Sequence, residues 1–336
     1  MKLLVTGGAG FIGSNFIRFM LKRYDDVEIV NFDALTYAGN LENLAGIEDE
    51  KRYAFVRGDI TARADLDAIF DASPFDAVLN FAAETHVDRS LVDAGPFVST
   101  NVAGTQALID AVQQHAVPRL VQVSTDEVYG TLGPDGRFTE TTPLQPNNPY
   151  SASKAGGDCL VRAAVRCHGL DAVITRCSNN FGPYQFPEKL IPLIIANALE
   201  DKDLPVYGDG MQIRDWIYVE DHCAGIDCVM RNGIAGEVYN IGGSYDVPNL
   251  EIVKTILRLL DKPESLITFV TDRPGHDRRY AIDSSRIEQE LGWQPAHTFD
   301  AAIQDTIDWY RANPDWVAHT RSGEYVAYYE KMYAGR

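Results

Sequence analysis

The sequence has little cysteine, and its few cysteines follow no pairing pattern. There are five, with no Cys-x-x-Cys motif, and no export signal precedes them. We therefore expect reduced thiols and no disulfide framework. The seven histidines are scattered without zinc-like spacing, so we predict no metal site. The cysteines are Cys159, Cys167, Cys177, Cys223 and Cys228.

Basic residues and long apolar segments are also scarce. The chain has 30 lysines and arginines against 48 aspartates and glutamates, a net charge of −18. So acidic a surface is a poor partner for nucleic acid or an anionic membrane. No apolar run is long enough for a membrane span, and the N-terminus reads as a strand instead of a signal peptide. We expect a cytoplasmic protein that binds neither nucleic acid nor membrane.

What the chain does have is a regular alternation of strands and helices. Its 336 residues are 45% hydrophobic, enough for a large core with two lobes. In the first half the alternation is typical of an α/β fold, with a doubly wound parallel sheet of Rossmann type. The expected strands are 2–6, 27–32, 54–60, 77–83, 120–124 and 172–176, and the expected helices are 14–23, 65–71, 101–115, 150–168, 190–199, 300–310 and 323–333.

The alternation breaks after residues 179–183, where proline and glycine become denser. We expect a first domain over residues 1–182 and a smaller α+β substrate lobe over residues 183–336, with segments returning to the first lobe. Ligands of such sheets bind at the carboxyl ends of the strands. Residues at or near these ends are Gly7, Asp33, Asp59, Ala82, Thr125 and Cys177.

A glycine-rich turn follows the first strand. Gly7, Gly10 and Gly13 let the backbone turn tightly and approach a pyrophosphate at the start of a helix. The next strand ends at Asp33, where a carboxylate can accept hydrogen bonds from ribose hydroxyls and repel a 2′-phosphate. This pattern favours NAD over NADP and makes residues 1–182 the NAD-binding domain. The alternative is a plain glycine turn with a capping aspartate.

A second pattern combines Thr125-Asp126-Glu127 with Tyr150 and Lys154. Residues four apart share a helix face, and an ammonium there would lower the tyrosine pKa. Such a tyrosine can take an alcohol proton while hydride leaves the same carbon. Asp126 and Glu127 exceed the needs of an oxidation and indicate a second step, such as loss of water. Alternatively, they are simple turn or helix-start carboxylates.

Together these motifs resemble the extended short-chain dehydrogenases/reductases, and among them the dTDP-glucose 4,6-dehydratase family, over essentially the whole chain. The Thr-Asp-Glu triplet and the Pro-Gly-His-Asp run are its specific motifs. Thr85 stands where the family usually has serine, and Phe181 where it usually has tyrosine, so any polar contact of that hydroxyl is lost. The matching segments are 6–13, 33–40, 82–90, 124–130, 179–184, 187–192, 207–210, 214–216 and 272–280.

The resemblance implies a role for each catalytic residue. Tyr150 removes the C4 hydroxyl proton as hydride passes to NAD⁺, Lys154 lowers the tyrosine pKa and holds the nicotinamide ribose, and Thr125 hydrogen-bonds the C4 oxygen. Glu127 then removes the C5 proton, and Asp126 protonates the C6 hydroxyl, which leaves as water. Hydride returns to C6, so NAD is regenerated and the product is a 4-keto-6-deoxy sugar nucleotide.

The resemblance also implies binding residues and a homodimer, in which helices 101–115 and 150–168 pair with their copies. For Arg214 the alternative to a diphosphate contact is an ion pair. His86 either touches the substrate or hydrogen-bonds within its loop. The implied NAD contacts are Gly7, Gly10, Phe11, Ile12, Gly13, Asp33, Leu35, Thr36, Asp59, Ile60, Phe81, Ala82, Ala83, Thr100, Tyr150, Lys154 and Asn180. The implied dTDP-glucose contacts are Thr85, Thr125, Asn179, Lys189, Leu190, Pro205, Tyr207, Arg214, Asn249, Asp272 and His276.

Three alternative functions stay open. The sequence does not separate thymine from uracil, so a UDP-glucose 4,6-dehydratase is one. A sugar-nucleotide 4-epimerase or decarboxylase is another, since it would use Tyr150 and Lys154, although an epimerase would not need the two carboxyls as an acid-base pair. A catalytically silent NAD-sensing regulator is the third, although it would not need to keep the catalytic residues.

Overall fold

Seven parallel strands form the sheet of the first lobe, in the order β10-β6-β5-β4-β1-β2-β3. The computed structural model describes residues 1–321. In β1, Leu3, Leu4 and Val5 are fully buried, because helices cover both faces of the sheet. The strands are β1 Lys2–Thr6, β2 Glu28–Asp33, β3 Tyr53–Arg57, β4 Ala77–Asn80, β5 Leu120–Thr125, β6 Ala172–Cys177 and β10 Val238–Ile241.

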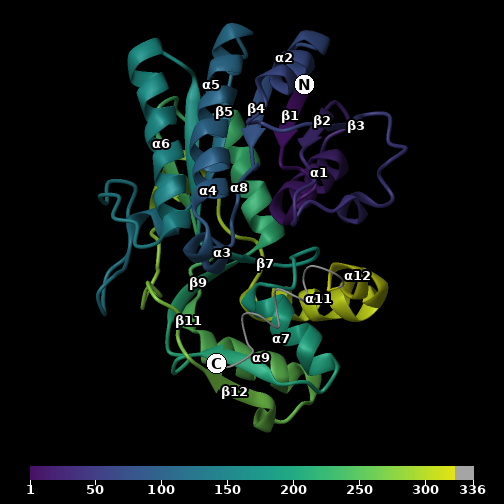
Figure 1. The fold of residues 1–336 in the computed structure, drawn as a ribbon, viewed down its shortest axis with the longest axis vertical. Coiled ribbons are helices and arrows are strands. Elements are labelled where there is room, and N and C mark those ends of the chain that lie inside the picture. Colours follow the sequence, from purple (N-terminus) through teal and green to yellow (C-terminus); the bar gives the residue numbers. More distant parts are fainter. Residues whose placement is uncertain (322–336) are drawn as a thin grey trace.

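Helices pack on both faces of this sheet (Figure 1). Apolar residues of α1 and α8 form one core with the sheet, and those of α2, α5 and α6 form a second core on the opposite face. This arrangement confirms the predicted doubly wound fold. The helices of this lobe are α1 Phe11–Arg23, α2 Arg63–Ala72, α3 Val87–Val92, α4 Gly95–Val98, α5 Thr105–Gln114, α6 Pro149–His168, α8 Val219–Asn232 and α10 Ser285–Leu291, with the π-helix η2 Ser99–Gly104 and the 3-10 helices η1 Leu41–Leu44 and η3 Asp126–Tyr129.

A second, smaller lobe lies below the first in Figure 1. Its apolar core joins four helices to two small sheets, one ordered β11-β9-β7 and the other pairing β12 with β8. Its elements are β7 Asn179–Phe181, α7 Leu190–Leu199, β8 Leu204–Tyr207, β9 Ile213–Tyr218, β11 Asp246–Pro248, α9 Asn249–Leu260, η4 Glu264–Leu266, β12 Ile267–Val270, α11 Phe299–Ala312 and α12 Pro314–Thr320. Because α8, β10 and α10 pack on the first lobe, the chain crosses between lobes several times, whereas the exact boundary at residue 182 stays a prediction.

Two expected strands are too long in the sequence analysis. Strand β3 ends at Arg57 and β4 ends at Asn80, so Asp59 and residues 81–83 lie in loops just beyond the sheet. The chain turns at Asp59 because its carboxylate accepts hydrogen bonds from both the backbone N–H and the hydroxyl of Thr61, each at 2.8 Å. The expected helix 323–333 lies outside the described residues.

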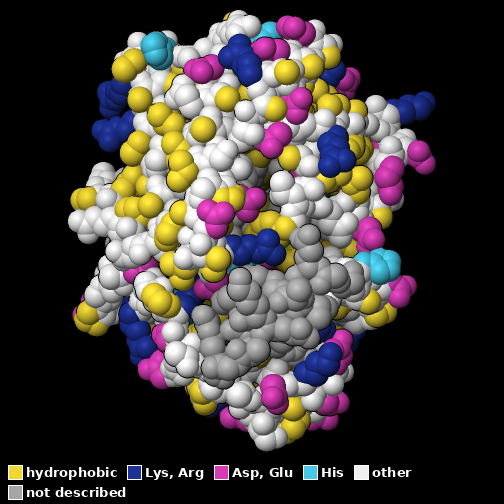
Figure 2. Space-filling model, in the orientation of Figure 1, with side chains coloured by type: hydrophobic (Ala, Val, Ile, Leu, Met, Phe, Trp, Pro, Cys, Tyr) yellow, Lys and Arg dark blue, Asp and Glu magenta, His cyan; other side chains and the backbone are white. Residues whose placement is uncertain are grey.

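The expected helix 101–115 is the end of a longer helical run. It begins at Gly95, passes through the π-helical segment η2 and continues as α5 to Gln114. On this face of the molecule, hydrophobic side chains gather over α5 and α6, while acidic and basic side chains are interspersed elsewhere (Figure 2). None of the helices within residues 1–321 combines the length and apolar character needed to cross a membrane.

Candidate active site

One cavity follows the carboxyl ends of the central strands, from the glycine turn to the first turn of α6. All five predicted catalytic residues line it, as do all predicted NAD contacts except Leu35. The predicted residues that line it are Gly7, Gly10, Phe11, Ile12, Gly13, Asp33, Thr36, Asp59, Ile60, Phe81, Ala82, Ala83, Thr85, Thr100, Thr125, Asp126, Glu127, Tyr150, Lys154, Asn179, Asn180 and Lys189.

The glycine turn leaves room for a ligand at the start of α1. Gly7 has a φ of +69°, and a Cβ there would lie 2.5 Å from the backbone nitrogen of Ala82. At Gly10 a Cβ would meet only Gly7 O, at 3.3 Å, so this side of the turn is open. The first turn of α1 has no acidic side chain to compete for its N–H groups. These features fit the pyrophosphate of a dinucleotide.

Asp33 closes the other side of the same turn. Its carboxylate accepts hydrogen bonds from Ala9 N at 2.9 Å and Leu35 N at 2.8 Å. Burial raises the pKa of Asp33, and these two backbone bonds offset part of the rise. Leu35 itself does not line the cavity: it has a φ of +54° and its side chain packs against the core. Its contribution to this end of the site is its backbone N–H.

Helix α6 carries Tyr150 and Lys154. It begins at Pro149, where the side chain of Asn148 accepts a hydrogen bond from Ser151 N at 2.9 Å. Both residues are buried and line the cavity. The expectation that Lys154 lowers the tyrosine pKa stays a prediction. Burial and the Glu127 carboxylate raise the pKa of Tyr150, while the Lys154 ammonium donates to Val123 O at 2.8 Å and is directed at strand β5.

Thr125, Asp126 and Glu127 lie where β5 ends and a 3-10 turn begins. The Thr125 hydroxyl lies 3.3 Å from Asp126 Oδ1 and also accepts a hydrogen bond from Glu127 N at 3.3 Å. Burial raises the pKa of Asp126 well above its usual range, and the carboxylates of Glu127 and Asp215 raise it further. Asp126 Oδ2 is buried and has no hydrogen-bond partner within residues 1–321. The surroundings of Asp126 favour its protonated form and leave Oδ2 without a partner in the described chain.

The sequence analysis missed Glu188, a buried carboxylate in the cavity wall. Glu188 Oε2 lies 3.3 Å from His86 Nε2, and Oε1 accepts a hydrogen bond from the hydroxyl of Tyr37 at 3.3 Å. Burial raises the pKa of Glu188 to about 7 and lowers that of His86. His86 therefore links its loop to the second lobe, beyond the loop contact that the sequence predicted. In the sequence, the only feature that could have identified Glu188 is its place next to Lys189, a predicted substrate contact. In the structure, the Lys189 ammonium donates to Thr85 O at 3.0 Å.

The other predicted substrate contacts lie outside this cavity, mostly in the second lobe. Arg214 is 5% exposed, and its guanidinium donates to Ile213 O at 2.8 Å and Asp277 O at 2.9 Å. Within residues 1–321 it forms no ion pair, so the predicted alternative of an ion pair is wrong for this part of the chain. The carboxylates of Asp126 and Glu127 are nevertheless close enough to influence its pKa, which burial lowers. The residues outside the cavity are Leu190, Pro205, Tyr207, Arg214, Asn249, Asp272 and His276.

The two departures from the family pattern have different surroundings. Phe181 is 1% exposed and packs against Tyr218 and Phe299, with ring centroids 5.8 and 5.3 Å apart. It lies in the core of the second lobe, so a missing hydroxyl there removes no group from the cavity. Thr85 lines the cavity and keeps the hydroxyl that serine would supply.

Further cavity residues were missed as site residues because their motifs carry no chemical signature. Glu84 stands beside predicted residues, and Cys177 ends β6, the strand end that the sequence pattern indicated. Burial raises the pKa of the Cys177 thiol to about 12, which keeps it neutral. Among residues 1–321, no group of three or more histidine, cysteine, aspartate or glutamate side chains could hold a metal ion.

Comparison with known proteins identifies the family of the chain. The chain matches the sequence profile of the GDP-mannose 4,6 dehydratase family over residues 4–306. It is 54% identical to a dTDP-glucose 4,6-dehydratase of Xanthomonas campestris pv. campestris, with 96% of each chain covered.

Two solved structures are similar along almost their whole length. One is a dTDP-glucose 4,6-dehydratase of Bacillus anthracis in complex with NAD, at 50% identity and a TM-score of 0.90, covering 95% of this chain and 99% of the other. The other is DesIV, the dTDP-glucose 4,6-dehydratase of Streptomyces venezuelae with NAD and TYD bound, at 48% identity and a TM-score of 0.92, covering 95% and 100%. The chain thus belongs to the GDP-mannose 4,6 dehydratase family and, within it, to the dTDP-glucose 4,6-dehydratases.

Proposed function

We propose that this protein is an NAD-dependent lyase that converts dTDP-glucose to dTDP-4-keto-6-deoxyglucose and water. The observation that carries the proposal is Asp126. Its carboxyl is buried, its surroundings raise its pKa and so favour the protonated form, and its Oδ2 has no partner within residues 1–321. An oxidation alone has no use for such an acid, whereas loss of water needs a proton for the departing hydroxyl.

The cofactor fits the open side of the glycine turn, with Asp33 near the adenosine ribose. When bound, NAD supplies reversible hydride acceptance, from C4 of the sugar and back to C6. The chain's own residues then move the protons. Tyr150 takes the C4 hydroxyl proton, and the Thr125 hydroxyl holds the C4 oxygen.

Elimination follows from the neighbouring carboxyls. The C4 ketone acidifies the C5 proton, which Glu127 removes. Asp126 gives its proton to the C6 hydroxyl, the C6–O bond breaks, and water leaves. As hydride returns to C6, the proton that Glu127 removed goes back to C5, which completes the 4-keto-6-deoxy sugar. The raised pKa of Asp126 supports this division, because two adjacent carboxyls with different environments can act as acid and base.

Lys154 lines the cavity one helical turn after Tyr150. We assign Lys154, whose ammonium donates to Val123 O, to holding the nicotinamide ribose and to lowering the pKa of Tyr150 when the cofactor is bound. A buried neutral phenol at rest is consistent with a proton that leaves only when a bound substrate and the cationic nicotinamide are both present.

The diphosphate is expected at Arg214. A buried guanidinium without a carboxylate partner in the described chain is a favourable site for an anion, and its planar donors match phosphate oxygens. Asn249 Oδ1 is also buried without a hydrogen-bond partner within residues 1–321.

Part of the proposal is that the enzyme is a cytoplasmic homodimer with α5 and α6 at its interface. This part rests on the family resemblance and on the hydrophobic side chains over these helices (Figure 2).

Product analysis tests the function directly. The purified protein is incubated in separate reactions with dTDP-glucose and UDP-glucose, and the products are identified by mass and NMR. We expect loss of water and a C4 ketone, with dTDP-glucose preferred. Formation of dTDP-galactose with oxygen retained at C6 would identify an epimerase instead, and a preference for UDP-glucose would correct the base.

A further inference from the structure

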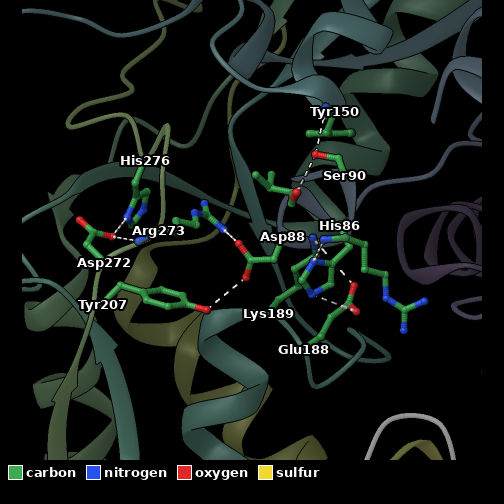
Figure 3. Close-up of polar contacts among 12 residues, drawn as sticks. His86, Asp88, Ser90, Tyr150, Glu188, Lys189, Tyr207, Asp272, Arg273 and His276 are labelled. Atoms are coloured by element: carbon green, nitrogen blue, oxygen red, sulfur yellow. Dashed lines mark hydrogen bonds and ion pairs between the residues drawn. The ribbon is translucent and has the colours of Figure 1, made fainter. Parts of the chain in front are cut away.

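A buried carboxylate of the first lobe holds two side chains of the second. Asp88 lies in α3, and its side chain is 7% exposed. Its Oδ2 accepts a hydrogen bond from the hydroxyl of Tyr207 at 3.1 Å, and its Oδ1 accepts one from Arg273 Nη1 at 3.2 Å. Tyr207 ends β8, and Arg273 follows β12. Figure 3 shows Asp88 between these two side chains, at the junction of the lobes.

Asp88 accepts a hydrogen bond from only one edge of the Arg273 guanidinium and leaves the other edge available. The contact uses Nη1, whereas Nε and Nη2 form the edge that binds two oxygens in parallel. Arg273 Nε is buried and has no hydrogen-bond partner within residues 1–321. A buried donor without a partner is costly, so this edge is suited to a ligand with several acceptor oxygens.

The surrounding loop braces the same arginine. Arg273 N donates to Asp272 Oδ1 at 2.8 Å, and this oxygen also lies 2.6 Å from His276 Nδ1. The rings of His276 and Tyr207 pack edge to face at 6.0 Å. Tyr207, Asp272, Arg273 and His276 thus form one connected cluster, which Asp88 attaches to the first lobe.

The helix that carries Asp88 is also fixed against the catalytic tyrosine. Ser90 Oγ accepts a hydrogen bond from Tyr150 N at 3.3 Å, and Val87 packs in one apolar cluster with Phe97 and Tyr150. Burial alone would lower the pKa of Arg273, but the carboxylates of Asp88 and Glu127 raise it, so the guanidinium is near enough to Glu127 to be influenced by its charge. The position of the arginine is therefore set relative to the reacting groups.

We propose that Asp88 is a positioning residue, which directs the Nε/Nη2 edge of Arg273 and the ring of Tyr207 toward the diphosphate of the nucleotide sugar at a fixed place relative to Tyr150. This rests on the proposed function, since it takes dTDP-glucose as the ligand. Asp88 does not touch the substrate and transfers no proton. A buried ion pair is by itself weak evidence for stability, which is why the effect is sought in binding.

The test measures binding of dTDP to the NAD-loaded enzyme by calorimetry, and turnover of dTDP-glucose. In Asp88→Asn the amide oxygen can still accept from Tyr207, but its NH₂ group faces the guanidinium. We expect the Kd of dTDP and the KM of dTDP-glucose to rise roughly tenfold, the scale of one charge-assisted hydrogen bond, with kcat within about twofold. The control is Asp93→Asn, which removes the same charge just after α3, where the carboxylate accepts from Gly95 N; it should leave both constants unchanged.

A double variant separates positioning from a general structural effect. In an Arg273→Ala background, Asp88→Asn should weaken dTDP binding by less than about twofold, because the arginine through which it acts is gone. Asp88→Glu keeps the charge but displaces it by one methylene, and should also weaken binding. It keeps the test valid if Asp88→Asn does not fold. An unchanged Kd in the single variants, or a further tenfold loss in the Arg273→Ala background, would overturn the proposal.

Failure of this proposal differs from failure of the proposed function. If the wild-type protein binds dTDP and dehydrates dTDP-glucose while the Asp88 variants bind normally, only the role of Asp88 is wrong. If the wild type binds dTDP without dehydrating dTDP-glucose, the proposed function is wrong and the dTDP affinities still decide the role of Asp88. No binding of dTDP by the wild type would overturn both.

Discussion

The two ends of the cavity differ in how far the protein satisfies its own polar groups. At the cofactor end, both oxygens of Asp33 accept backbone hydrogen bonds, and the carboxylate of Asp59 is engaged by Thr61. At the catalytic end, Asp126 Oδ2 and the hydroxyl of Ser124 are buried without partners in the described chain. At the cofactor end, the carboxylates are already hydrogen-bonded within the protein. At the catalytic end, buried polar groups are left for a ligand to hydrogen-bond.

The difference in hydrogen bonding indicates that one end of the cavity serves cofactor binding and the other serves the reaction. Buried polar groups without partners are normally rare, because each costs free energy. Asp126 Oδ2 and Ser124 Oγ lie in the cavity wall with Tyr150 and Glu127, where substrate and cofactor can supply the missing partners. Changes at the catalytic end should therefore act mainly on rate, and changes at the cofactor end mainly on affinity and stability.

The largest expected effect is that of Tyr150→Phe. The variant loses the group that takes the C4 proton but keeps nearly all of the side-chain volume. Turnover should fall on the order of a hundredfold or more, the usual scale for a general base, with dTDP binding largely kept. Stopped-flow absorbance of NADH and calorimetry with dTDP measure the two quantities. Wild-type turnover would show that a different group takes this proton.

Asp126→Asn and Glu127→Gln should divide oxidation from elimination. Each keeps the shape of the side chain and removes a proton transfer, so overall turnover should fall roughly a hundredfold. Bound NAD should still be reduced on mixing with dTDP-glucose, and its absorbance should persist longer than in the wild type. Solvent deuterium should enter C5 slowly in Glu127→Gln. Normal dehydration by both variants would remove the basis for the proposed chemistry.

At the cofactor end, Asp33→Asn should act on binding. The amide cannot accept hydrogen bonds through its NH₂ group and no longer repels a 2′-phosphate, so NAD affinity and the preference for NAD over NADP should each fall about tenfold. Because Asp33 also accepts from Ala9 N and Leu35 N, thermal stability should fall too. Equilibrium binding of both cofactors and a melting curve measure these effects. An unchanged cofactor preference would show that Asp33 only braces the turn.

The pH dependence offers a smaller but directional test. Asp126 must be protonated to act, so elimination should be lost as the pH rises through its raised pKa. Asp215, whose own pKa burial raises to about 6, contributes to that rise when ionised. Asp215→Asn removes a negative charge, lowers the pKa of Asp126 and should move the alkaline limb of kcat to lower pH, a loss of a few-fold at a pH on that limb. A limb that stays in place would show that Asp215 does not influence the acid.

The sequence predicted those features that depend on local pattern. The glycine turn, the strand end at Thr125 and the helix from Tyr150 are each set by residues close together in the chain. The partners of Glu188 and Asp88 were not predictable, because their burial is created by segments more than a hundred residues away. Lys154 shows what local pattern cannot predict. Its spacing from Tyr150 predicts that the two side chains share a helix face, but it does not predict that the Lys154 ammonium donates to Val123 O.

The smallest expected effect is that of Phe181→Tyr, which restores the residue usual in the family. If the second-lobe core is separate from the cavity, kcat and KM should each change by less than about twofold, since Phe181 is 1% exposed and does not line the cavity. The added hydroxyl enters a core of Tyr218 and Phe299, where an unpaired polar group costs about 1–3 kcal/mol. Denaturant unfolding and steady-state kinetics measure the two effects separately. A clear rise in activity would mean that this hydroxyl reaches the site, and the separation between the lobe core and the cavity would have to be redrawn.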